Sequence, residues 1–128
     1  ATIESVQEKQ HFIRQNGKKV FKFAVKGMAD VSERILTQNN LMGEDIALFI
    51  PHQANKRIID AAADRCNIPA EKVFINIDRY GNTTAGTIPI AMNEAVEDGQ
   101  IQDGDIILLA AFGAGFTWGS ILLKWEAS

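Results

Sequence analysis

A histidine and an asparagine each follow a short apolar run and precede a helical pattern. His52 stands in the stretch FIPHQAN, residues 49 to 55, and Asn82 stands in the stretch DRYGNTTAG, residues 78 to 86. Ligands of an open α/β sheet usually bind beyond the carboxyl ends of its parallel strands, where both side chains are predicted to lie. The partial positive charge of a helix N-terminus disfavours a protonated imidazole, so His52 is predicted to be neutral and to donate one N–H.

Each of these residues also has an ordinary structural interpretation. His52 could cap a helix or be a satisfied histidine, and Asn82, beside Gly81, could be a turn or N-cap residue. The two are more informative together, because neutral donors at neighbouring strand ends can converge on one oxygen. That is the geometry of an oxyanion or enolate site, where each donor contributes about 3 kcal/mol.

Two further features could take part in chemistry. The stretch from Gly113 to Gly115 is either a tight hairpin turn or a turn that presents a backbone N–H to an oxyanion, and a dinucleotide loop is excluded because a strand follows it. Lys56 and Arg57 form a small basic spot in an acidic chain. This spot is either a solvated helix face, with Lys56 paired to Asp60, or a contact for an acidic or phosphate-bearing partner.

The elements that would position these residues alternate between helices and short strands. Hydrophobic periodicity and turn residues predict helices at 19 to 38, 53 to 66 and from about 87, and strands at 46 to 50, 73 to 75, 106 to 112 and 116 to 125. The link between the last two strands is too short for a parallel crossover, so they should be antiparallel. The predicted fold is α/β, with a layered, mostly parallel mixed sheet, covering helices and an antiparallel C-terminal strand pair.

Composition limits the class of protein. The 128 residues are 46% hydrophobic and 23% charged, as in a globular domain, and the net charge of −3 argues against a nucleic-acid binder. No apolar run approaches the roughly 20 residues of a membrane span. The single cysteine, Cys66, fits a reducing cytoplasm, and its place on an apolar helical stripe favours packing over a nucleophilic role. Without metal-ligand spacing around the two histidines, we expect no metal site.

Three motifs resemble the C-terminal half of β-ketoacyl-acyl-carrier-protein synthase III, a condensing enzyme of the thiolase-like superfamily. They are PHQANKRII at 51 to 59, DRYGNTTAG at 78 to 86 and AAFGAGFTWGS at 110 to 120, in the order of the family. The similarity extends over about residues 12 to 125, and it implies that residues 1 to 128 form one thiolase-like C-terminal lobe. Related condensing enzymes that pair two histidines fit less well, because His52 is matched here with Asn82.

The resemblance implies a decarboxylative Claisen condensation of an acyl-CoA primer with malonyl-acyl carrier protein, with no further cofactor. His52 and Asn82 would donate hydrogen bonds to the malonyl thioester oxygen and so stabilise the enolate. The backbone N–H of Ala114, where the family commonly has glycine, would bind the tetrahedral oxyanion, and Phe112 would line the cavity. The residues implied to contact the carrier protein or CoA are Gln53, Ala54, Asn55, Lys56 and Arg57.

The resemblance also implies that the nucleophilic cysteine belongs to an N-terminal half outside this chain, because Cys66 does not stand in its motif. We therefore expect this chain alone to be inactive, with part of its apolar surface exposed and prone to self-association. The complete enzyme is expected to be a cytoplasmic homodimer. Two alternatives remain open: a stand-alone, non-catalytic module that binds carrier protein, and a CoA-dependent condensing enzyme of the polyketide type.

Overall fold

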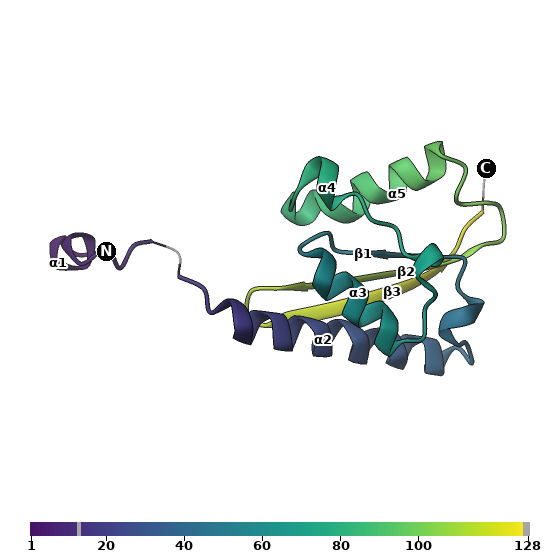
Figure 1. Ribbon diagram of the computed structural model, residues 1–128, viewed down its shortest axis with the longest axis horizontal. Helices are drawn as coiled ribbons and strands as arrows, with labels where there is room; N and C mark the ends of the chain where they lie inside the picture. Colours follow the sequence, from purple (N-terminus) through teal and green to yellow (C-terminus); the bar gives the residue numbers. More distant parts are fainter. Residues whose placement is uncertain (13, 127–128) are drawn as a thin grey trace.

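The computed structural model describes residues 1–12 and 14–126, and one mixed sheet lies between two helical layers (Figure 1). Its strands, in the spatial order β1-β2-β3, are β1 (Leu48–Pro51), β2 (Ile106–Gly113) and β3 (Thr117–Lys124). β1 pairs with β2 in parallel, and β2 pairs with β3 antiparallel. The predicted α/β class, with its antiparallel C-terminal pair, is confirmed.

The helical layers differ in size. The α-helices of the described residues are α1 (Ile3–Gln7), α2 (Gly17–Gln38), α3 (Lys56–Arg65), α4 (Ile77–Tyr80) and α5 (Thr87–Glu97). α2 and α3 cover one face of the sheet and α5 covers the other, while α1 lies away from the body of the molecule (Figure 1). In the part of the chain described here, no helix is both long and apolar enough to cross a membrane.

The central strands are buried on both faces. Phe49 of β1 packs with Leu108 of β2 in the cluster beneath α2 and α3, whereas Leu48 and Ile50 belong to the cluster under α5. Because both faces are covered, the strand reads as a continuous apolar run rather than as an alternating one, which is what the sequence shows. The outer strand β3 is less covered, and the side chain of Ile121 is 58% exposed.

α2 lies close against β3 because it carries a glycine at the contact. A Cβ atom added to Gly27 would stand 2.8 Å from the ring of Trp118. A hydrogen bond fixes the same approach, since the Ser120 hydroxyl donates to the carbonyl oxygen of Val31 at 2.9 Å. The long helix is therefore held along the full antiparallel pair, with its N-terminus at the hairpin end of the sheet.

The strand predicted at residues 73 to 75 is wrong. Val73 makes only an isolated parallel bridge to Phe49, whose carbonyl oxygen accepts one bond, of 2.9 Å, from the backbone N–H of Phe74. The next ladder position is taken by a side chain, because Nε2 of Gln53 donates to the carbonyl oxygen of Phe74 at 3.1 Å. In a parallel ladder the next N–H would come from residue 51, but Pro51 has none, so the strand ends and the Gln53 amide satisfies this carbonyl.

α3 begins three residues later than predicted. The sequence suggested a helix from residue 53, but the helix starts at Lys56 because Asn55 is its N-cap. The Asn55 side-chain oxygen accepts a hydrogen bond of 3.0 Å from the backbone N–H of Arg57. The residues from His52 to Asn55 consequently form a short non-helical link between β1 and α3.

Candidate functional site

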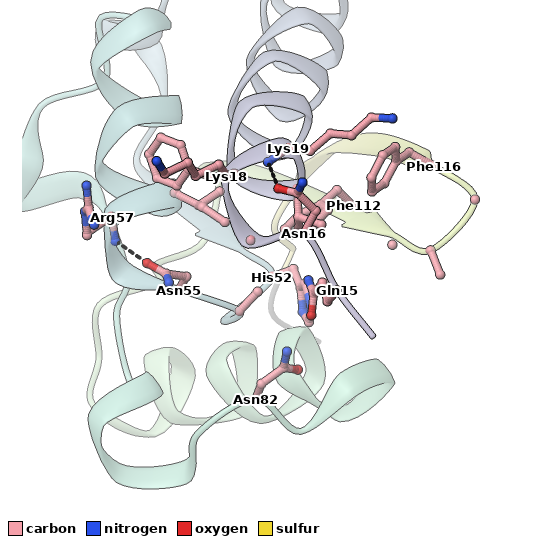
Figure 2. A pocket seen from close by; sticks show the side chains of 18 of the residues that line it. Gln15, Asn16, Lys18, Lys19, His52, Asn55, Arg57, Asn82, Phe112 and Phe116 are labelled. Carbon is pink, nitrogen blue, oxygen red and sulfur yellow. Dashed lines mark hydrogen bonds between the residues drawn. The ribbon is translucent and has the colours of Figure 1, made fainter. Parts of the chain in front are cut away.

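The two predicted donors lie at one cavity. His52, Asn82, Phe112 and Ala114 all line an open cavity of about 1250 Å³ at the carboxyl ends of β1 and β2. In Figure 2 the side chain of Asn82 extends from its loop toward the region where His52 lies. The parallel pairing of β1 with β2 brings residue 52 to the same end of the sheet as residues 112 to 114, and the loop between α4 and α5 brings Asn82 to the same cavity.

His52 is held from three directions. Its backbone N–H donates to the carbonyl oxygen of Ala110 at 2.7 Å, which continues the β1–β2 ladder by one residue. Its Nδ1 atom lies 2.6 Å from the hydroxyl oxygen of Thr87, the first residue of α5. Its ring meets that of Phe112 edge-on, at 5.9 Å between centroids and an interplanar angle of 62°. The imidazole is therefore positioned before any ligand binds.

Burial keeps the imidazole of His52 neutral. Loss of water around the half-buried ring lowers the pKa of His52 from its usual 6.5, since a charged imidazolium is poorly solvated there. The predicted cause of a neutral His52 was a helix N-terminus, but α3 begins only at Lys56, so the principal cause is burial instead. A neutral ring has one N–H, which suits the donor role predicted for it.

Asn82 is exposed and is held only by its own loop. Its side-chain carbonyl oxygen accepts a hydrogen bond of 3.0 Å from the backbone N–H of Thr84, two residues further on. This is the turn interaction that the sequence offered as an ordinary explanation. Because the turn uses the oxygen of the amide, the NH₂ group is the part of the side chain that can donate at the cavity.

Ala114 lies in the exposed turn between β2 and β3. The Thr117 hydroxyl donates to the carbonyl oxygen of Ala114 at 3.3 Å, so that oxygen is engaged within the turn. The next residue, Gly115, has a φ of +146°, and a Cβ there would come within 3.1 Å of the Thr117 nitrogen. Glycine at this position is therefore required by the turn, whereas Ala114 fits it with a side chain.

Gln53 is a structural residue and not a surface contact. Its side chain is buried, with 1% of the residue exposed, and its Nε2 atom donates to the carbonyl oxygens of Pro51 and Phe74. Its Oε1 atom accepts a hydrogen bond of 3.0 Å from the backbone N–H of Asn76. The interpretation of Gln53 as a carrier contact is corrected: a polar residue beside a motif histidine suggests a surface position, but this one satisfies buried backbone groups.

The remaining predicted contact residues divide into two kinds. Ala54, Asn55 and Arg57 line the cavity, and the Arg57 guanidinium lies 5.4 Å from the centroid of the Phe21 ring. Lys56 does not line it: its ammonium group forms an ion pair of 2.8 Å with Asp60 one turn further along α3. For Lys56 the solvated helix face is thus the arrangement observed.

The cavity has a positive rim that the sequence motifs did not indicate. Arg14, Lys18 and Lys19 line it together with Arg57, and none of the described lining residues is acidic. The lysines belong to the first turn of α2, which Asn16 caps by accepting a hydrogen bond of 3.0 Å from the backbone N–H of Lys19. The sequence contains this lysine pair directly after an Asn-Gly turn, but only the fold brings the pair to the same cavity as Arg57 (Figure 2).

Cys66 lies in the core, outside the cavity. Its thiol is buried at the end of α3 and approaches the carbonyl oxygen of Ala29 at 3.6 Å. Burial raises the pKa of Cys66 to about 11, so the nucleophilic thiolate is scarce at neutral pH. This placement agrees with the predicted packing role. Among residues 1–12 and 14–126, no cluster of three or more His, Cys, Asp or Glu residues could hold a metal ion.

Comparisons with known proteins agree on one family. The model of the 3-oxoacyl-[acyl-carrier-protein] synthase III C-terminal family matches residues 36–125. β-Ketoacyl-[acyl-carrier-protein] synthase III of Chlorobium phaeobacteroides is 54% identical over 126 residues, which are 98% of this chain and 38% of that protein. The chain thus spans well under half of the length of this relative.

Solved structures of the same enzyme have the same fold. The 3-oxoacyl-[acyl-carrier-protein] synthase III of Aquifex aeolicus matches with a TM-score of 0.87 and 47% identity, over 92% of this chain and 38% of that one. The Pseudomonas aeruginosa enzyme matches with a TM-score of 0.88 and 37% identity, over 99% and 40%. The chain has the thiolase-like fold and belongs to the family of C-terminal regions of 3-oxoacyl-[acyl-carrier-protein] synthase III.

Proposed function

We propose that this chain stabilises the enolate and binds the carrier protein in a decarboxylating condensing enzyme that initiates fatty-acid synthesis. One observation carries the proposal: His52 and Asn82 line one cavity with the β2–β3 turn, and four cations line the same cavity. The names of the relatives supply the carrier and the class of reaction. The nucleophilic cysteine comes from the rest of the full-length protein.

The chemistry assigned to the two donors is charge stabilisation. When the malonyl group loses carbon dioxide, the electron pair of the broken C–C bond moves onto the thioester, and negative charge collects on its oxygen. The neutral N–H of His52 and the NH₂ group of Asn82 donate to that oxygen, each contributing about 3 kcal/mol. The enolate carbon then attacks the acyl carbon held on the cysteine, and the Ala114 N–H binds the tetrahedral oxyanion that forms. When the oxyanion collapses, the bond from the acyl carbon to the cysteine sulfur breaks and the thiolate leaves.

The positive rim is assigned to an acidic carrier protein and its phosphorylated arm. Arg14, Lys18, Lys19 and Arg57 lie at the cavity, although the whole chain has a net charge of −3. A surface of one sign around a cleft attracts a partner of the opposite sign and raises its rate of encounter.

The proposal is tested by condensation activity in the full-length protein that carries this chain. His52→Ala should lower the rate of product formation from malonyl-carrier protein by about 100-fold or more, because a charge-stabilising donor is lost. The matched control is His11→Ala, which removes an exposed histidine in the N-terminal segment and should leave the rate unchanged. Full activity of His52→Ala would contradict the proposal, and a preference for malonyl-CoA over malonyl-carrier protein would contradict the assigned partner.

A further inference from the structure

Thr87 offers one hydroxyl proton to two acceptors. Its Oγ1 atom lies 2.6 Å from Nδ1 of His52 and 3.2 Å from the carbonyl oxygen of Thr84. If the proton went to Thr84, the Thr87 oxygen would have to accept from His52, and the neutral ring would carry its proton on Nδ1. If the proton goes to His52, the ring carries its proton on Nε2 instead.

The two distances favour donation from Thr87 to His52. Hydroxyl donors usually lie about 2.5–3.0 Å from an oxygen acceptor. The contact of the hydroxyl with Nδ1, at 2.6 Å, is the closer of the two. The 3.2 Å contact with Thr84 is longer than hydroxyl bonds usually are. The stronger bond is therefore the one to the imidazole.

The surroundings of Thr87 keep its hydroxyl in place. The residue is 3% exposed and opens α5, whose first turn continues directly from the loop that carries Asn82. A threonine in a helix divides between two χ1 rotamers, and the rotamer observed here places the hydroxyl beside the ring of His52. Burial also lowers the pKa of His52 and so keeps the ring neutral. Only a neutral imidazole exists as two tautomers, with its single proton on Nδ1 or on Nε2.

We infer that Thr87 is a positioning residue that fixes His52 as the Nε2–H tautomer, with its only N–H directed away from α5 and free for a ligand oxygen. The inference rests on the proposed function, because only a donor role makes the Nε2 proton matter. In the opposite tautomer the Nε2 atom would present a lone pair to the enolate oxygen, and the donor would become a repulsive acceptor. Thr87 thus determines whether the Nε2 atom of His52 is a hydrogen-bond donor or an acceptor.

The tautomer can be read directly by ¹⁵N NMR of the histidine-labelled chain, which contains only two histidines, with exposed His11 as the internal reference. At pH 7.5 we expect a protonated Nε2 and an unprotonated Nδ1 for His52 in the wild type and in Thr87→Ser. Thr87→Val, which keeps the shape but removes the hydroxyl, should let the Nδ1–H form appear. A wild-type ring protonated on Nδ1, or a tautomer unchanged in Thr87→Val, would overturn the inference.

Decarboxylation by the full-length protein separates this inference from the proposed function. Thr87→Val should lower kcat by about tenfold or more with KM within about twofold, and Thr87→Ser should restore most of the rate, as expected for a partner that orients a functional histidine. If Thr87→Val changes the tautomer but not the rate, the inference stands and the donor role of His52 fails. The spectra of the wild type and of Thr87→Ser still test the tautomer if Thr87→Val does not fold.

Discussion

His52 and Asn82 line the same cavity, His52 directly after β1 and Asn82 in the loop between α4 and α5, but they are held very differently. His52 is fixed by a ladder bond to Ala110, by the Thr87 hydroxyl and by the edge of the Phe112 ring. Asn82 is exposed, and its side chain makes one turn bond within its own loop. His52 is half-buried and fixed between the sheet and α5, whereas Asn82 is exposed on a loop.

Because they are held differently, the two members of the proposed donor pair can be separated by experiment. A change at His52 alters core packing as well as chemistry, because its ring lies against Phe112 and Thr87. A change at Asn82 can be confined to the amide nitrogen, since its oxygen alone serves the fold. Substitutions of Asn82 therefore test the chemistry with little effect on the fold. Substitutions of His52 test how the fold positions a donor.

The largest effect is expected from Asn82→Asp. Aspartate keeps the oxygen that accepts from Thr84 but removes the donor and adds a negative charge beside the developing enolate. We expect condensation by the full-length protein to fall by more than about 100-fold, while the free energy of unfolding stays within about 0.5 kcal/mol of wild type. Steady-state kinetics and urea denaturation measure the two quantities, and retained activity would remove Asn82 from the donor pair.

Gln53→Leu should give the next largest effect, this time on the fold. Gln53 joins the end of β1 to the segment that leads toward Asn82, and its loss leaves the buried backbone groups of Phe74 and Asn76 without these bonds. The expected cost is about 1–3 kcal/mol in the free energy of unfolding. Urea denaturation measures it, with exposed Gln100→Leu as the control, and equal stability of the two variants would contradict this assignment.

Arg57→Glu should weaken carrier binding by a smaller factor. Reversing one charge of the cavity rim should raise KM for malonyl-carrier protein by about fivefold at low salt, with kcat unchanged, and the difference should shrink as salt screens the charges. The control is Arg34→Glu, the same charge change at an exposed position on α2 outside this cavity. If both variants raise KM equally, the effect is one of net charge and not of the rim.

The smallest effect concerns pH and separates His52 from Asn82, which has no proton to titrate. Burial lowers the pKa of His52, so below pH 6.5, its usual value, the unfolded chain binds a proton more readily than the folded one. Stability should therefore fall as the pH drops from 6.5 through the lowered pKa, and stay level above 6.5 as far as this group is concerned. Urea denaturation at pH 7.5 and 5.5 should show a smaller loss for His52→Gln, and equal losses would contradict the assignment.

Features that local pattern controls were predictable from the sequence. The continuous apolar run before His52 and the short link at Gly113 to Gly115 predict a doubly covered strand and an antiparallel pair, and both are confirmed. The resemblance named the family because its motifs are local too. Cys66 is recognisable as a core residue from its place on an apolar stripe.

Features that depend on contacts distant in sequence were not predictable. Gln53 and Thr87 are polar residues without a distinctive spacing, and each has a hydrogen-bond partner that lies 21 to 35 residues away. The same holds for the rim, because Lys18 and Lys19 come to the same cavity as Arg57 only when α2 packs beside α3. Side-chain hydrogen bonds and surface charge clusters are set by the assembled fold, which periodicity does not encode.

The enolate assignment is tested most directly by decarboxylation of malonyl-carrier protein without a primer, measured on the full-length protein with His52→Ala and with Asn82→Ala. This reaction forms the enolate and requires no acyl-enzyme, so it isolates the step assigned to the two donors. We expect each variant to lose at least about 100-fold in the release of carbon dioxide. Decarboxylation that persists at the wild-type rate while condensation is lost would contradict the assignment of His52 and Asn82 to the enolate.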